Sequence, residues 1–214
     1  LKAGKTKKGI KAVASHTGSL AGSARIYSGV FKQTGMIEAK DWIELFDFAK
    51  AFAMQPLPKG NKLLIVTNGG GFGVLATDEA MRCGLNLKDL PIKIKRKLKK
   101  IMPRHVILHN PIDLAGDADV KRYEIAINSC LPFYDGVVVV ALFELPTIDE
   151  KMIDILVKVN KRYKKPLLVC AVGGSYTRNF VEKLENKGIP VYSSPERAVK
   201  TFAAMSTYSE RLTS

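Results

Sequence analysis

The chain has 214 residues, of which 46% are hydrophobic and 25% are charged. It contains 34 lysines and arginines and 20 acidic residues, which gives a formal net charge of +14. This composition suits a globular protein with a substantial core. Because no apolar run approaches the roughly 18 residues of a membrane span, and residues 1–5 lack a signal-peptide pattern, we expect a cytoplasmic protein that does not bind membranes.

Residues 1–55 combine a glycine-rich, basic opening with two predicted helices. The first is expected over about Ser23 to Gln33. The second begins near Asp41, which can cap it, and runs to Gln55. Its apolar residues follow a helical period and predict a packing face, made of Trp42, Ile43, Leu45, Phe46, Ala49, Phe52 and Ala53. Residues 56–60 contain two prolines and are expected to be a linker.

Residues 61–214 alternate between short apolar runs and helical stretches. The runs at 63–66, 136–141, 167–171 and 189–192 are continuous, as in parallel strands that are buried on both faces. The β-α-β-α order predicts an α/β fold with a doubly wound parallel sheet. In such sheets, ligands bind at the loops that follow the carboxyl ends of the strands.

The first predicted strand runs directly into a glycine-rich turn, which is followed by a helix. Glycine lets the backbone approach a ligand closely, and the amino end of a helix attracts anions. The turn has neither the dinucleotide-binding nor the P-loop spacing, so a plain tight turn is the alternative. The candidate phosphate-binding residues are Gly69, Gly70, Gly71, Phe72 and Gly73.

A second glycine-containing turn follows the strand at 167–171 and again opens a helix. Its residues Gly173, Gly174 and Ser175 should lie on the same rim as the first turn, because parallel strands end at one edge of a sheet. They are a candidate pocket rim, with an ordinary turn as the alternative.

His16 lies between small, polar and flexible residues, which favours an exposed loop over a core position. A neutral imidazole can accept a phosphoryl group and release it again. Ser15, Thr17 and Gly18 could hold that phosphate through hydroxyl and N–H groups. From chemistry alone, an exposed histidine without a function remains the alternative.

The other chemistry-bearing residues indicate structural roles. His105 and His109 are four residues apart, but Pro111 and the β-branched residues between them argue against a helical metal site. The three cysteines show no metal or disulfide spacing. Lysines dispersed over helices such as 92–100 indicate solvated faces or attraction of anionic substrates, and no motif for reading nucleic acid accompanies them.

Together, these segments resemble the NDP-forming acyl-CoA synthetases, the family of ADP-forming acetate–CoA ligase and succinyl-CoA synthetase. The likeness spans nearly the whole chain and is closest to the archaeal-type alpha subunit. The segments that carry it are LKAGK (1–5), SHTGSLAG (15–22), TNGGGFGVLA (67–76), NPIDL (110–114), IPVY (189–192) and SPERA (194–198).

The resemblance implies a reversible relay in which acyl-CoA, phosphate and ADP give acid, CoA and ATP. His16 matches the phosphohistidine, which makes it the expected catalytic residue. The turn at Gly69 to Gly73 matches a helix end that faces the phosphorylated histidine. The implied fold is a complete flavodoxin-like domain at 61–214, preceded at 1–55 by the helical tail of a second such domain that carries the histidine.

The resemblance also implies components that these 214 residues do not include: a CoA-binding domain and an ATP-grasp subunit or domain that holds nucleotide and Mg²⁺. We therefore expect a hetero-oligomer, and a chain that is inactive when isolated. The sequence does not indicate the acyl substrate or a preference for ADP over GDP. Two other readings stay open, a regulatory module of a protein acetyltransferase and an FMN-binding flavodoxin-like domain.

Overall fold

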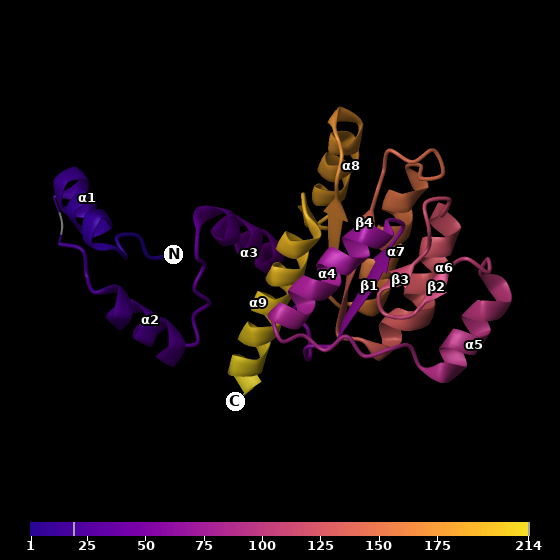
Figure 1. Ribbon diagram of the computed structural model, residues 1–214, viewed down its shortest axis with the longest axis horizontal. Helices are drawn as coiled ribbons and strands as arrows, with labels where there is room; N and C mark the ends of the chain where they lie inside the picture. Colours follow the sequence, from indigo (N-terminus) through magenta and orange to yellow (C-terminus); the bar gives the residue numbers. More distant parts are fainter. Residues whose placement is uncertain (19, 214) are drawn as a thin grey trace.

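The computed structural model describes residues 1–18 and 20–213 and places the predicted strands in one six-stranded sheet (Figure 1). The three longest strands, β1 (Leu63–Thr67), β4 (Gly136–Ala141) and β5 (Leu167–Ala171), are buried along their whole length and pair in parallel. Burial on both faces explains why their sequences are continuously apolar.

Three strands of two residues each complete the sheet in the order β2-β3-β1-β4-β5-β6: β2 (Ile107–Leu108), β3 (Ile112–Asp113) and β6 (Val191–Tyr192). Without β2, the parallel strands follow the flavodoxin-like order 2-1-3-4-5. The predicted α/β class is confirmed. The sheet is mixed, however, because β2 pairs antiparallel with β3.

Alternate residues of the central strands contribute to two cores. The core on one face includes Leu64 and Val66 and is covered by the helices α5 (Ile92–Ile101), α6 (Val120–Cys130), α7 (Lys151–Tyr163) and α8 (Ser175–Glu185), with the short 3₁₀ helix η1 (Leu131–Phe133). The other core includes Leu63 and Ile65 and is covered by α4 (Gly70–Arg82) and α9 (Pro195–Thr213). No helix among the described residues is long and apolar enough to cross a membrane.

The helix α3 (Trp42–Met54) has the predicted bounds, and Asp41 caps it by accepting a bond from the Glu44 N–H at 2.8 Å. Its predicted packing face is wrong in part. The helix packs on α9 through Asp47 and Ala51 (Figure 1), and both Asp47 carboxylate oxygens bond the Arg197 guanidinium at 2.7 Å. Apolar residues on the opposite side of the helix are exposed among the described residues, as in Trp42 (66%) and Phe46 (65%).

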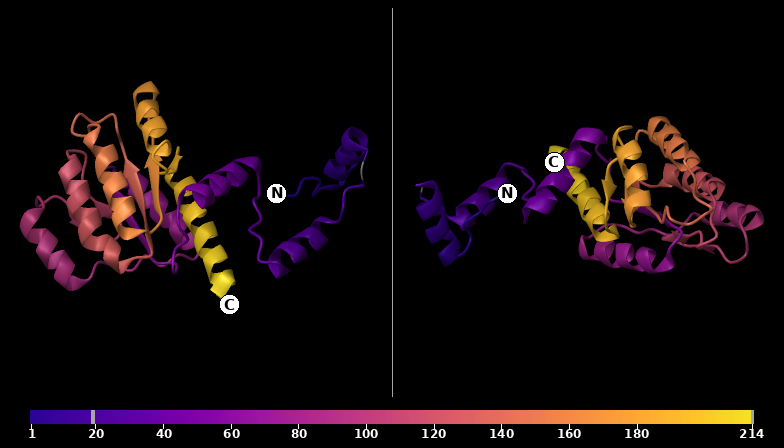
Figure 2. Two further views of the ribbon diagram at one scale, coloured as in Figure 1. Left: turned by 180° about the vertical axis from the view of Figure 1, so that it is seen from behind. Right: turned by 90° about the horizontal axis from the view of Figure 1, so that it is seen from above.

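The first two helices, α1 (Lys7–Thr17) and α2 (Ala24–Gln33), extend from the body as an arm (Figure 2). The bounds of α2 agree with the prediction, whereas α1 replaces an expected flexible loop. Thr6 caps α1 by accepting a bond from the Gly9 N–H at 3.1 Å, and Gly18 ends it in the left-handed conformation. No described residue before Ala39 is buried.

Candidate functional site

The carboxyl ends of β1, β4 and β5 lie on one rim, and side chains connect the loops that follow them. The Leu142 N–H, after β4, donates to Asn68 Oδ1, after β1, at 2.9 Å. The Gly174 N–H, after β5, donates to Glu144 Oε1 at 2.6 Å. The two glycine turns therefore belong to one connected rim, as the topology predicted.

The first glycine turn presents free backbone donors at the start of α4. Thr67 Oγ1 accepts a bond from the Gly69 N–H at 2.9 Å and donates to the Gly69 carbonyl at 3.0 Å, which fixes the turn. The first helical bond runs from the Gly73 N–H to the Gly69 carbonyl at 3.1 Å. Within the described residues, the N–H groups of Gly70, Gly71 and Phe72 have no acceptor. This helix end can therefore hold an anion.

The glycines of this turn differ in their surroundings. Gly73 is buried, and a Cβ there would lie 3.1 Å from Thr67 Cγ2. Gly71 is exposed, and a Cβ there would meet nothing within 4 Å. Packing thus requires a small residue at Gly73 but leaves open space beside Gly71.

Asp113 is a rim residue to which the sequence analysis gave no role. Its Oδ1 accepts a bond from the Ala115 N–H at 2.9 Å, and its Oδ2 lies 2.7 Å from the position that a Cβ on Gly70 would take. A phosphate at the start of α4 would feel this negative charge, so the backbone donors must outweigh it. Asp113 and Gly70 are 43 positions apart in sequence, and the β1–β3 pairing brings them close.

The second glycine turn already has an anion beside it. Glu144 accepts the bond from Gly174 described above, and its carboxylate also lies close to Gly173. The start of α8, which includes Ser175, is therefore less open to a phosphate than the start of α4. A ligand-binding role for Gly173, Gly174 and Ser175 stays a prediction.

His16 lies in the last turn of α1 and is exposed, not in the loop that we expected. Its Nδ1 is 2.9 Å from Ser15 Oγ, which itself donates to the Ala12 carbonyl at 3.1 Å. Thr17 Oγ1 donates to the Val13 carbonyl at 2.7 Å, so this hydroxyl serves the helix end. The adjoining Ser19 of the matched motif lies outside the described residues.

The structure does not bring His16 to the glycine turn. Figures 1 and 2 show α1 on the arm, separated from α4 by α2 and α3. Contact between His16 and the start of α4 would need a movement of the arm or a second chain.

The two other histidines are surface residues that pair with carboxylates. His105 Nε2 lies 3.0 Å from Asp117 Oδ1, and His109 Nδ1 lies 3.1 Å from Asp89 Oδ2. Hydrogen bonds from Arg122 and His105 hold the pKa of Asp117 well below its usual range. No group of three histidine, cysteine or acidic residues in the described part of the chain could hold a metal ion.

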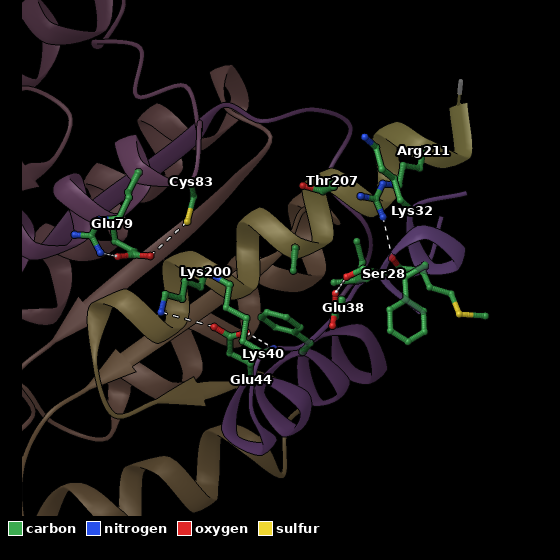
Figure 3. A pocket seen from close by; sticks show the side chains of 16 residues that line it. Ser28, Lys32, Glu38, Lys40, Glu44, Glu79, Cys83, Lys200, Thr207 and Arg211 are labelled. Carbon is green, nitrogen blue, oxygen red and sulfur yellow. Dashed lines mark hydrogen bonds and ion pairs between the residues drawn. The ribbon is translucent and has the colours of Figure 1, made fainter. Parts of the chain in front are cut away.

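A pocket of about 460 Å³ lies between the arm and the helices α3, α4 and α9 (Figure 3), and none of the predicted site residues lines it. Its charged groups are largely paired with one another, as in Lys200 with Glu44 at 3.8 Å and the buried Glu79 with Arg82. Cys83 also faces it and lies 3.5 Å from Glu79 Oε1. We assign no chemistry to this pocket.

We expect Cys83 to react slowly with iodoacetamide at pH 8. Burial, followed by the hydrogen bond to Glu79, raises the pKa of its thiol to about 11. Only the thiolate is nucleophilic, so roughly one molecule in a thousand is reactive three pH units below that value. The rate, measured by mass spectrometry of the Cys83 peptide, should rise about tenfold per pH unit between 8 and 10. A rate at pH 8 equal to that of free cysteine would contradict this.

The sequence of the body matches a known family. A model described as the Ligase-CoA domain matches residues 63–210, more than half of the chain. The chain belongs to this family. A second model, the succinyl-CoA ligase like flavodoxin domain, matches residues 1–52, which include α1, α2 and His16.

Several relatives of this chain are named as ADP-forming ligases. The alpha subunit of acetate–CoA ligase [ADP-forming] I from Pyrococcus furiosus is 40% identical over 98% of this chain and 46% of its own length. The 4-hydroxybutyrate–CoA ligase [ADP-forming] of Nitrosopumilus maritimus is 34% identical over 98% of this chain and 30% of its own. The chain thus spans less than half the length of these relatives.

A solved structure shows the same fold. The dinucleotide-forming acetyl-coenzyme A synthetase 1 of Ca. Korarchaeum cryptofilum, in complex with phosphate and ADP, superimposes with a TM-score of 0.89 and 35% identity. The match covers 98% of this chain and 46% of that one. All three of these relatives are CoA ligases or synthetases, which gives the acetyltransferase-associated alternative no support.

Proposed function

We propose that this chain is the phosphohistidine-bearing part of an ADP-forming acyl-CoA synthetase, which reversibly converts acyl-CoA, ADP and phosphate into acid, CoA and ATP. One observation carries the proposal: a Ligase-CoA domain with an open, glycine-lined helix end shares a chain with an exposed histidine in a segment that matches the succinyl-CoA ligase like flavodoxin domain. The names of the relatives agree with it.

The contacts of His16 suit a nucleophile that acts through Nε2. Because Ser15 Oγ gives its proton to the Ala12 carbonyl, its lone pairs can accept a proton from His16 Nδ1. The tautomer with a proton on Nδ1 leaves a lone pair on Nε2. No described residue bonds Nε2, so it is open to a phosphoryl group.

In the transfer step, Nε2 of His16 attacks the phosphorus of an acyl phosphate, and the P–O bond to the acyl group breaks with its electrons leaving on the carboxylate. An oxygen of the ADP terminal phosphate then attacks the same phosphorus. The P–N bond breaks, and its electrons return to Nε2. ATP is formed, and His16 is restored.

The two helix ends favour a histidine that moves. His16 lies at the carboxyl end of α1, where the helix dipole disfavours the negative charge of a phosphoryl group. The amino end of α4 favours that charge. Docking of phosphorylated His16 against Gly70, Gly71 and Phe72 would therefore stabilise the intermediate, and Gly69 and Gly73 shape the turn.

The arm and α3 fit a larger assembly. Their exposed apolar side chains, which include Ile26, Tyr27, Val30, Trp42 and Phe46, form a surface that soluble proteins normally cover. In our proposal, residues 1–55 are the helical tail of a flavodoxin-like domain, residues 56–60 are a linker and residues 61–214 are a second such domain. The sheet of the first domain would cover the exposed side chains.

CoA, ADP or ATP, phosphate and Mg²⁺ are the expected ligands of the assembly, and an ATP-grasp module and a CoA-binding domain are its expected partners in a cytoplasmic hetero-oligomer. The described residues fit phosphate at the start of α4 but include no group of three histidine, cysteine or acidic residues that could hold a metal ion. In our proposal, the ATP-grasp module therefore holds Mg²⁺.

The reconstituted complex tests the proposal. With acetyl-CoA, ADP, phosphate and Mg²⁺, the chain together with its nucleotide-binding and CoA-binding partners should form ATP, followed by a hexokinase-coupled assay. Omission of phosphate or of this chain should each abolish ATP formation. Equally fast ATP formation by the two partners in the absence of this chain would contradict the proposal.

A further inference from the structure

A basic groove of about 690 Å³ runs along the free edge of the sheet, between α5 and β2. Both of these elements lie at the end of the molecule away from the arm (Figure 1). We call this basic groove the edge groove. It is lined by Lys95, Lys99, Pro103, Arg104, Val106, Ile107, Leu108 and His109, and thus by cations and apolar side chains without any carboxylate.

Two of the lining cations have no counter-charge. Asp89 pairs with His109 Nδ1 at 3.1 Å and with Lys95 Nζ at 3.6 Å. Its negative charge therefore offsets positive charge at one end of the groove. No carboxylate in the described part of the chain lies within ion-pair distance of Lys99 or Arg104. Positive charge therefore accumulates at the other end.

The groove is held in shape by the core. The buried Leu98 and the half-buried Ile94 anchor α5 on the body. Lys95 and Lys99 are four positions apart in α5, so they lie on one helix face, about 6 Å from each other. Ile107 is 53% exposed and offers an apolar surface beside these cations.

We propose that the edge groove binds a nucleoside diphosphate group, with its phosphates between Lys99 and Arg104 and its nucleoside against Ile107. Lys99 and Arg104 line the same groove, and each can donate charge-assisted hydrogen bonds to a phosphate. The site is separate from the start of α4 and does not depend on the phosphohistidine reaction. The same chemical group occurs in free ADP and within CoA.

A nucleic-acid surface fits the groove less well. Strand-binding proteins combine a basic track with several aromatic side chains on which bases stack, whereas no described phenylalanine, tyrosine or tryptophan lines the groove. The cations on the outer side of α5, such as Lys93 and Lys97, lie outside the groove and serve as a matched control.

Isothermal titration calorimetry of the chain with ADP and with CoA, at 150 mM salt, tests the site. We expect saturable binding of at least one of them, and the comparison identifies the source of the diphosphate. The variant with Lys99→Ala and Arg104→Ala should bind at least about tenfold more weakly. The variant with Lys93→Ala and Lys97→Ala loses the same charge but should change affinity less than twofold.

Gly71→Leu, at the start of α4, should leave this binding unchanged, which separates the edge groove from the proposed phosphohistidine site. Three results would overturn the inference: no saturable binding of either probe, an equal loss in both double variants, or displacement of ADP by a lower concentration of a single-stranded oligoribonucleotide. Thermal unfolding of each variant checks that the fold is intact.

Discussion

The His16→Ala variant of the reconstituted complex should take up no acid-labile, base-stable phosphate from labelled ATP and Mg²⁺, a loss of at least about a thousandfold in phosphorylation rate. The reason is that no other described side chain near His16 provides an uncharged nitrogen nucleophile. His105 and His109 are on the body and pair with carboxylates.

His105→Ala is the matched control, because it also removes an exposed histidine and His105 does not line the edge groove. It should keep full labelling. His16→Ala should leave the free energy of unfolding within about 0.5 kcal/mol, because this side chain is exposed and its hydrogen bond joins it only to the neighbouring Ser15. Undiminished labelling of His16→Ala, or loss of labelling in His105→Ala alone, would show that the phosphate is carried elsewhere.

The sequence was sufficient where one local pattern decides the structure. The apolar runs at 63–66, 136–141 and 167–171 are continuous because both faces of their strands are covered. Asp41 identified the start of α3 because a cap acts within a few residues.

The prediction from the sequence was wrong where one residue type can occur in two kinds of local structure. Gly9 and Gly18 suggested a flexible loop around His16, but Gly9 donates to the Thr6 cap and Gly18 ends α1. Thr6 before the lysines and Gly18 after the last turn were the signals of a helix. The strands β2 and β3 have two residues each and are too short for a hydrophobic period.

The sequence predicted that the two glycine turns share a rim, but not the individual contacts between distant segments. The approach of Asp113 to Gly70 and the bond from Gly174 to Glu144 depend on strand order, which only the folded chain defines. The apolar face of α3 shows the same limit. Its periodicity identified apolar residues that could be buried, but not that the helix packs mainly on α9 with one side and leaves its other side exposed.

Gly71→Leu should slow single-turnover phosphorylation of His16 by about a hundredfold or more while leaving the fold intact. A leucine there fits the structure, because a Cβ at Gly71 would meet nothing within 4 Å. Its side chain would nevertheless stand at the first turn of α4, where a phosphate must approach the free N–H groups. The measurements are rapid-quench labelling and the thermal midpoint.

Gly29→Leu on α2 is the matched control, since a Cβ there also meets nothing within 4 Å, and labelling should stay unchanged. Gly73→Leu should instead destabilise the protein by about 1–3 kcal/mol through the contacts with Thr67 and Pro111. An unchanged labelling rate in Gly71→Leu would remove the start of α4 from the site.

The Gly71 result would be informative because the fold itself does not require glycine at this position. Its backbone is not left-handed, and no described neighbour lies within 4 Å of the position that a Cβ would take. A glycine within a helix costs about 1 kcal/mol relative to alanine. An exposed helical glycine without a packing role, at the end of a buried parallel strand and beside unbonded N–H groups, supports our proposal that the phosphorylated histidine comes close to this backbone.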